Sequence, residues 1–159
     1  MNFSVRSATK EDMPRVFTLI KELALYEKEP DAVETTVEDL EILGFGSQPK
    51  FHCMVAEVDG NIQAMALMYM RFSTWKGIAL HLEDLIVTKK MRGFGLGAAL
   101  LDEVVKYGSN LGVKRISWEV LDWNEPAIKF YKKKGAIILR DWDVVHLDEQ
   151  GIKDYLSKR

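Results

Sequence analysis

The sequence predicts a mixed α/β (α+β) fold in which an antiparallel N-terminal half is joined to a central β-α-β unit. Three strand-like apolar runs follow one another between residues 51 and 87. A glycine-rich turn over residues 93–97 then leads into a helical pattern, and a further strand and helix follow it. Antiparallel strands need only short turns, whereas a parallel pair needs a crossover connection, so this order of elements indicates a mixed sheet.

The chain is expected to begin with a strand and two helices. Residues 2–8 alternate weakly between polar and apolar side chains and predict the first strand. A threonine followed three residues later by an aspartate, at Thr9 and again at Thr36, resembles a capping box and predicts two helix starts. We expect the first helix to end before Pro30 and the second, shorter one to end near Gly44.

Three strands are predicted in the middle of the chain. The runs 51–58 and 62–72 flank Asp59-Gly60, a dipeptide that favours a hairpin turn. The run 78–87 follows after a short polar loop, which predicts a third antiparallel neighbour.

The C-terminal half carries a different pattern. After the glycine turn a helix is predicted as far as Gly112, and a strand over residues 113–121. Asn124 then opens a second helix with a proline in its first turn, and Gly135 ends it. Two short strands and a C-terminal turn are expected after that glycine.

Composition excludes several classes of protein. The 159 residues, with no linker or repeat, are expected to form a single domain over 1–159, and a net charge of −2 lacks the basic excess of nucleic-acid-binding proteins. The longest apolar run, 64–70, is far shorter than the roughly 20 residues of a membrane span. Cys53 is the only cysteine and the three histidines are widely spaced, so we expect no disulfide and no metal site. Without a signal-peptide pattern, the chain is expected to be cytoplasmic and to bind neither nucleic acid nor membrane.

The segment 82–98 carries the strongest chemical signal. Gly93, Gly95 and Gly97 alternate between the end of a strand and the start of a helix, and Arg92 stands beside them. Glycines let the backbone approach a ligand closely, and the free amides of a helix N-terminus favour phosphate. This pattern favours a phosphate-bearing ligand over a simple tight turn.

Two familiar phosphate loops fit this segment poorly. Gly93, Gly95 and Ala98 satisfy a loose dinucleotide fingerprint, and Glu119 lies near the spacing of a ribose-binding acid. That fingerprint, however, normally opens a parallel sheet with several further β-α-β units. A nucleoside-triphosphate loop is excluded because no Gly-Lys-Ser/Thr follows the glycines.

The loop instead resembles the acetyl-CoA loop of the GNAT superfamily of N-acetyltransferases. The resemblance rests on Arg92-x-x-Gly95-x-Gly97 after the strand that ends at Val87. Further segments are similar to the diamine (spermidine/spermine) N-acetyltransferase branch, namely Tyr26-Glu27, Leu82-Glu83-Asp84 and the run from Trp123 to Tyr131. The resemblance covers nearly the whole chain, and it implies a GNAT-like fold with helices on both faces of the sheet and a homodimer.

The resemblance also implies a role for individual residues. It assigns the binding of acetyl-CoA, as co-substrate, to Leu85, Ile86, Val87, Arg92, Gly93, Phe94, Gly95, Leu96, Gly97, Ala98, Asn124 and Ala127. It assigns the binding of the amine substrate to Tyr26, Glu27, Glu83 and Asp84, and we expect the acidic Glu119 on the following strand to join them. Tyr131 would be the general acid and Glu83 would assist deprotonation of the amine through water, with no metal involved.

The residues themselves leave the choice of base open. An amine attacks a thioester only when it is neutral, so the site must remove a proton from an ammonium group. Glu83 and Asp84 are candidates, but neighbours on a regular strand point to opposite faces and cannot share a cleft without a bulge. In a regular strand Asp84 would share its face with Leu82 and Ile86, and Glu83 would share the other with His81. A structural ion pair is the alternative role for these carboxylates.

The acidic side chains of the first half suit a cationic substrate. Between Tyr26 and Pro49 they far outnumber the single lysine, although most are expected on a solvated helix face. Glu27 differs because it continues the buried stripe of the first helix. Together with Glu83, Asp84 and Glu119 it would attract a polycation.

The sequence therefore predicts an N-acetyltransferase that moves an acetyl group from acetyl-CoA, by direct attack, to a primary amine of a small cationic substrate. That substrate would be a polyamine, a diamine or a lysine-like amino acid. Acetylation of a protein N-terminus or lysine is one alternative, and a non-catalytic acyl-CoA-binding module is another.

Overall fold

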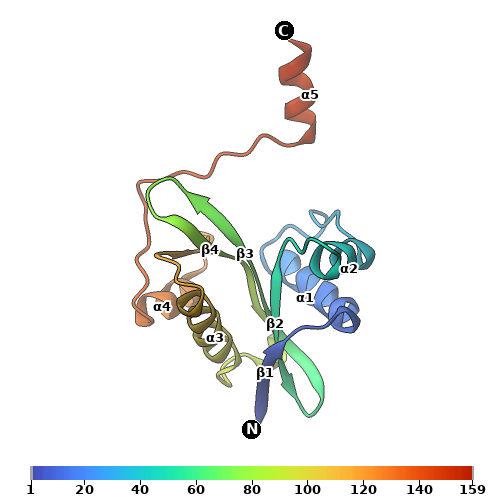
Figure 1. Ribbon diagram of the computed structural model, residues 1–159, viewed down its shortest axis with the longest axis vertical. Coiled ribbons are helices and arrows are strands. Elements are labelled where there is room, and N and C mark those ends of the chain that lie inside the picture. Colours follow the sequence, from blue (N-terminus) through green and yellow to red (C-terminus); the bar gives the residue numbers. More distant parts are fainter. Residues whose placement is uncertain (1, 159) are drawn as a thin grey trace. The chain divides into compact units, whose positions relative to one another are not determined.

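Five strands in the order β1-β2-β3-β4-β5 form one sheet in the computed structural model, which describes residues 2–158 (Figure 1). Two structural units divide the chain, Met1–Glu119 and Val120–Arg159, and the sheet belongs to the first. The strands are β1 (Phe3–Ser7), β2 (His52–Val58), β3 (Asn61–Ser73), β4 (Gly77–Val87) and β5 (Ile116–Ser117). The helices of this unit are α1 (Met13–Tyr26), α2 (Val37–Phe45) and α3 (Leu96–Asn110), with short 3-10 turns η1 (Lys10–Asp12) and η2 (Lys89–Met91).

Strand pairing confirms the predicted mixed sheet. β1 to β4 pair antiparallel with their neighbours, whereas β4 and β5 pair parallel and are joined through α3. Between β2 and β3, Asp59 and Gly60 both have positive φ values, 49° and 73°. Two consecutive residues with positive φ form a tight turn whose twist matches that of the two flanking strands. The predicted hairpin turn is therefore confirmed.

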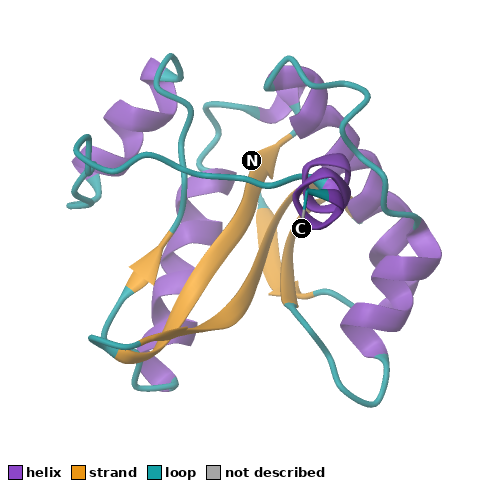
Figure 2. Cartoon of the chain, turned by 90° about the horizontal axis from the view of Figure 1, so that it is seen from above, coloured by secondary structure: helices purple, strands orange, loops and turns teal. Residues whose placement is uncertain are grey.

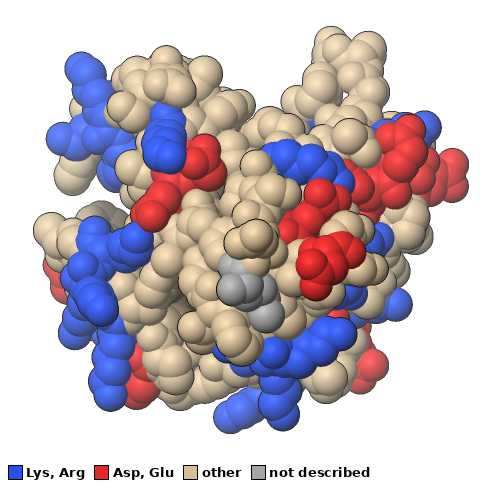
Figure 3. Space-filling view, turned by 90° about the horizontal axis from the view of Figure 1, so that it is seen from below, with Lys and Arg blue, Asp and Glu red and all other residues tan. Residues whose placement is uncertain are grey.

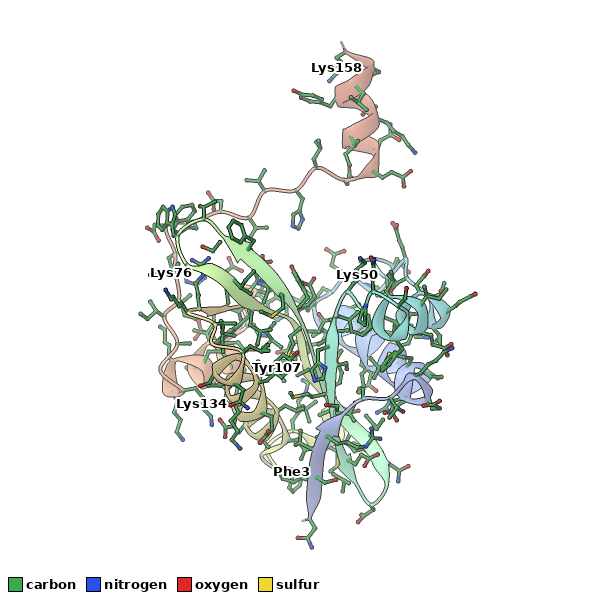
Figure 4. The ribbon with its side chains drawn as sticks, in the orientation of Figure 1. Phe3, Lys50, Lys76, Tyr107, Lys134 and Lys158 are labelled. Carbon is green, nitrogen blue, oxygen red and sulfur yellow. The ribbon has the colours of Figure 1, made fainter. Side chains whose placement is uncertain are left out.

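Helices cover both faces of the sheet. α1 and α2 lie on one side and α3 on the other (Figures 1 and 2). On the first side, Met13 and Leu19 of α1 pack in one buried cluster with Met65 and Leu67 of β3. On the other side, Tyr107 extends from α3 toward the sheet (Figure 4), where its ring stacks on His52 at a centroid distance of 4.6 Å.

Local side-chain bonds fix the helix starts as predicted. The Thr9 backbone N–H donates to Asp12 Oδ2 at 2.7 Å, and that of Thr36 donates to Asp39 Oδ2 at 2.8 Å. The second box is reciprocal, because the Asp39 N–H donates to Thr36 Oγ1 at 3.1 Å. α1 ends at Tyr26, before Pro30, as the sequence predicts.

The single cysteine lies in the core. Cys53, on β2, is 3% exposed, and burial, followed by the charges of Asp12 and Asp84, raises the pKa of its thiol to about 12. Its chemistry is therefore that of a small apolar side chain. Within residues 2–158, no helix has the length and apolar character needed to cross a bilayer.

The second unit contains α4 (Glu125–Lys133) and α5 (Glu149–Ser157). Asn124 caps α4 as predicted, because its side chain accepts a hydrogen bond from the Ala127 N–H at 3.4 Å. The two strands predicted after Gly135 are wrong: residues 137–148 form no strand in the described chain, and α5 follows them. This segment contains several apolar side chains but exposes them, Ile137 by 84% and Val145 by 88%.

The strand predicted over 113–121 is also shorter than expected. Only Ile116 and Ser117 pair with β4. An apolar run acquires strand structure only where a neighbouring strand accepts its hydrogen bonds, and the sequence pattern does not specify that neighbour.

Candidate active site

The pairing of β3 with β4 changes register at one point. Leu67 and Met68 are neighbours on β3, whereas their partners on β4, Asp84 and Leu82, are separated by Glu83. Glu83 is therefore the extra residue of a β-bulge, which breaks the alternation of side chains along the strand. Because Leu67 and Met68 face opposite sides of the sheet, Asp84 and Leu82 do as well.

The bulge brings both candidate bases to the face covered by α1 and α2. Asp84 pairs with Leu67, a member of the buried cluster beneath α1. Glu83 lies beside His81 on the same face, with 3.5 Å between Glu83 Oε2 and His81 Nε2. We expected Asp84 to share its face with Leu82, as in a regular strand, and this prediction is wrong. The bulge that Glu83 and Asp84 need in order to share a face is present.

Asp84 titrates far from its ordinary range. Burial, followed by the charges of Glu83 and Glu27, raises the pKa of Asp84 to about 7. Burial also raises the pKa of Glu27, which lies at the C-terminal end of α1. Within the described residues, no lysine or arginine forms an ion pair with any of these three carboxylates. A cluster of this kind attracts a cation from solution.

A histidine and a tyrosine that the sequence analysis missed lie next to the carboxylates. His81 is 7% exposed, its Nδ1 lies 3.1 Å from Ser117 Oγ, and its ring centroid lies 5.2 Å from that of Tyr69. Burial lowers the pKa of His81, whereas the charges of Glu83 and Glu119 oppose this shift. The charge of Glu119, which was predicted to bind the amine, therefore acts on a side chain that lies beside Glu83. The available sequence signal was a histidine between two leucines, directly before the carboxylates.

The glycine loop has the backbone that its sequence predicts. Gly93 and Gly95 have φ values of 86° and 91°, a left-handed conformation that costs an ordinary residue about 1–2 kcal/mol. Gly95 is the N-cap of α3, so the first amides of that helix have no partner within it. A Cβ at Gly97 would lie 3.4 Å from Val87 Cγ2, so the first turn of α3 lies against the end of β4.

The loop is tied to α1 through an arginine. Arg92 Nε donates to the Val87 carbonyl at 3.1 Å, and its guanidinium lies 4.6 Å from the ring centre of Tyr26. Two predicted residues from distant parts of the chain, Tyr26 and Arg92, are thus in contact. The other predicted loop residues lie at the start of α3, with Phe94 exposed, Leu96 buried and Ala98 half-buried.

The C-terminal end of β4 has a free edge. Its ladder with β5 consists of Leu80–Ile116 and His81–Ser117, and in the described part of the chain no pair joins residues 85–87 to β5. Backbone groups on that edge can therefore bond to an extended polar ligand. Leu85 and Val87 are half-buried, whereas the Ile86 side chain belongs to the core cluster.

Three predicted residues lie in the second unit, on or next to α4. Asn124 and Ala127 form the helix cap, and Tyr131 is buried, with its ring centroid 5.3 Å from that of Phe130.

A separate cavity of about 620 Å³ opens on the first unit. It is lined by Asp12, Arg15, Glu22, Glu57, Gly60, Asn61, Ile62, Gln63, Thr88 and Lys90. Its wall mixes charges of both signs, and Arg15 pairs with Glu22 at 3.3 Å. Figure 3 shows acidic and basic side chains side by side on the lower face of the molecule. The cavity contains neither Glu83 nor Asp84, and no group of three or more metal-ligating side chains occurs among residues 2–158.

Comparison with known proteins gives consistent matches. A family model described as "Acetyltransferase (GNAT) family" matches residues 13–136. Thialysine N-epsilon-acetyltransferase from Bos taurus is 34% identical over an alignment of 165 positions, which covers 97% of each chain. Spermidine/spermine N(1)-acetyltransferase-like protein 1 from Homo sapiens is 34% identical over 152 residues, 91% of this chain and 22% of the human protein.

A solved structure supports the fold. AAC(6')-Iy in complex with the bisubstrate analogue CoA-S-monomethyl-acetylneamine has a TM-score of 0.74 at 17% sequence identity. The match covers 94% of this chain and 99% of the other.

Proposed function

Because the chain belongs to the GNAT family of acetyltransferases, we propose that it transfers the acetyl group of acetyl-CoA to a primary amine of a small cationic substrate. The observation that carries the choice of substrate is the bulge at Glu83, which places Glu83 and Asp84 on one face next to Glu27. A carboxylate cluster without a cationic partner among residues 2–158 favours a compact, positively charged amine over a neutral acceptor.

The residues around the glycine loop fit the co-substrate. Gly93 and Gly95 hold a left-handed backbone, and the free amides at the start of α3 suit a diphosphate. The free edge of β4 at residues 85–87 offers backbone partners to an extended amide-bearing arm. Acetyl-CoA, when bound, supplies an acyl group activated as a thioester. Asn124 and Ala127 are proposed to contribute from α4, on the strength of their resemblance to the family motif.

The carboxylates are proposed to prepare the amine. Asp84, with its pKa raised to about 7, is suited to accept a proton near neutral pH, and Glu83 lies beside it with its side chain 54% exposed. Either group, directly or through a water, converts the ammonium to a neutral amine. The new amide C–N bond then forms as the thioester C–S bond breaks.

Tyr131 is proposed as the general acid. Its phenolic O–H would donate a proton to the departing sulfur, so that CoA leaves as the thiol. The neutral amine gives up one N–H proton as it becomes the amide, and that proton restores the tyrosine. This assignment rests on the similarity of the Asn124 to Tyr131 run to the diamine branch. Tyr131 is buried on α4, and its ring packs against that of Phe130.

An amine panel tests the proposed function. The protein is incubated with acetyl-CoA and, in turn, with polyamines, diamines, basic amino acids and a lysine-containing peptide, at mildly alkaline pH, and release of the CoA thiol is measured. We expect turnover with small cationic amines and competition by them against the peptide. Absence of thiol release with every amine would overturn the proposal.

A further inference from the structure

One arginine lies on the same face as the carboxylate cluster. Leu67, Tyr69 and Arg71 alternate along β3 and therefore share the face on which Asp84 and His81 lie. Arg71 is exposed, and within the described chain no ion pair or side-chain hydrogen bond joins it to another residue. An arginine without an acidic partner is unexpected close to carboxylates that would attract cations.

Arg71 acts on the same side chains as the carboxylates. The Tyr69 phenol is subject to the charges of Glu83, Arg71 and Glu119, and so is the buried His81 imidazole. Tyr69 and His81 are directly opposite each other in the β3–β4 ladder. Their two rings are therefore in contact, and the charges of Arg71, Glu83 and Glu119 act on both of them.

The register gives the spacing between the two signs of charge. Arg71 is opposite Ala79, and Asp84 is opposite Leu67, so the two charges lie four residues apart along β3. At about 3.3 Å per residue this is roughly 13 Å between backbone positions. An arginine side chain is long enough to cover part of this distance, and the substrate would span the rest.

The side-chain amine of a basic amino acid matches this arrangement. In a lysine-sized molecule six bonds separate the amine nitrogen from the carboxylate carbon, a span of roughly 7 Å when extended. Its amine can lie at the carboxylates while its carboxylate pairs with an arginine, in the bidentate geometry that this pair favours. A diamine of the same length would instead bring its second ammonium toward Arg71, where like charges repel.

We propose that Arg71 is a specificity-determining residue that binds the carboxylate of an α-amino acid, whose side-chain amine is the acetyl acceptor. This inference rests on the proposed acetyltransferase function and names the substrate class of that same site. It adds no step to the chemistry, because the C–N bond still forms at the side-chain amine and the C–S bond of the thioester breaks.

Two matched substrate pairs test the inference. Lysine and cadaverine, like ornithine and putrescine, differ only in the α-carboxylate, so kcat/KM is measured for each member. We expect the unaltered protein to favour the amino acid of each pair. Arg71→Gln should lower kcat/KM for the amino acid roughly 10- to 100-fold, mainly through KM, because a charge-assisted pair is lost. The same change should leave the diamine unaffected or improve it, and Arg71→Lys should restore part of the loss.

A control variant separates specificity from net charge. Lys76 is an exposed cation at the turn between β3 and β4 (Figure 4), so Lys76→Gln removes the same charge at the end of the hairpin. It should change kcat/KM for both members of a pair by the same small factor. If Arg71→Gln also changes both members equally, or if the unaltered protein prefers the diamines, the inference about Arg71 is wrong while the proposed function stands. If none of the amines is acetylated, the proposed function itself is wrong.

Discussion

Asp84 provides a test of the site through stability alone. Its pKa is raised from 3.8 to about 7 in the folded protein, chiefly by burial. At about 1.36 kcal/mol per pKa unit, keeping this carboxylate ionised in the folded state costs at most about 4 kcal/mol. Asp84→Asn removes the charge while retaining the shape, so it should stabilise the protein wherever the parent carboxylate is ionised.

The sign of the pH dependence follows from proton binding. Between pH 3.8 and about 7 the unfolded chain has lost the Asp84 proton whereas the folded chain retains it. The folded state then holds the extra proton, so its stability falls as pH rises through this window, and the full cost is present above pH 7. The stability advantage of Asp84→Asn should therefore be small near pH 4 and approach its limit near pH 8.

Urea unfolding of both proteins at several pH values in this window measures the difference. Asp31→Asn, at an exposed aspartate, is the matched control and should show no advantage that grows with pH. An advantage for Asp84→Asn that is the same at every pH would refute the reasoning. So would a variant that is less stable than the parent at pH 8.

Three further predictions concern other parts of the molecule. Tyr131→Phe should lower kcat about 10²- to 10⁴-fold with little change in affinity for CoA, since it removes only a proton donor; an unchanged kcat would remove Tyr131 as the acid. Gly95→Ala should cost about 1–2 kcal/mol of unfolding free energy and weaken binding of acetyl-CoA in a titration, because φ is 91° there. Gly97→Ala, where a Cβ meets only ordinary contacts, should not lower the unfolding free energy of the free protein. The exposed apolar side chains of residues 137–147 predict self-association, so light scattering should give twice the 18.2 kDa chain mass, and a monomer at micromolar concentration would contradict this.

Features decided by local sequence were predictable. The capping boxes at Thr9 and Thr36, the Asp59-Gly60 turn and the glycine loop depend on residues within a few positions of one another. Their geometry follows from bonds that the local chain makes with itself. The overall fold was predictable for a related reason, because short turns and one crossover helix leave few ways to order the strands.

Features decided by pairing were not predictable. At Glu83 the neighbours Leu67 and Met68 of β3 pair with residues that are two positions apart on β4. Nothing in the sequence of β4 marks this change of register. The same limit applies to residues 137–148, where two short strands were predicted although the described part of the chain offers them no ladder partner. The contact between Tyr69 and His81 could not be predicted either, because only the register of β3 and β4 places the two residues opposite each other.

The burial of Cys53 makes the protein convenient to assay. A thiol-specific reagent that detects released CoA should not react with the folded protein, because its one cysteine is buried and almost wholly protonated at neutral pH. Each unfolded molecule, by contrast, exposes a single thiol, which the folded protein buries in β2. The same reagent can therefore count turnover in one experiment and opening of β2 in another, with no label added to the chain.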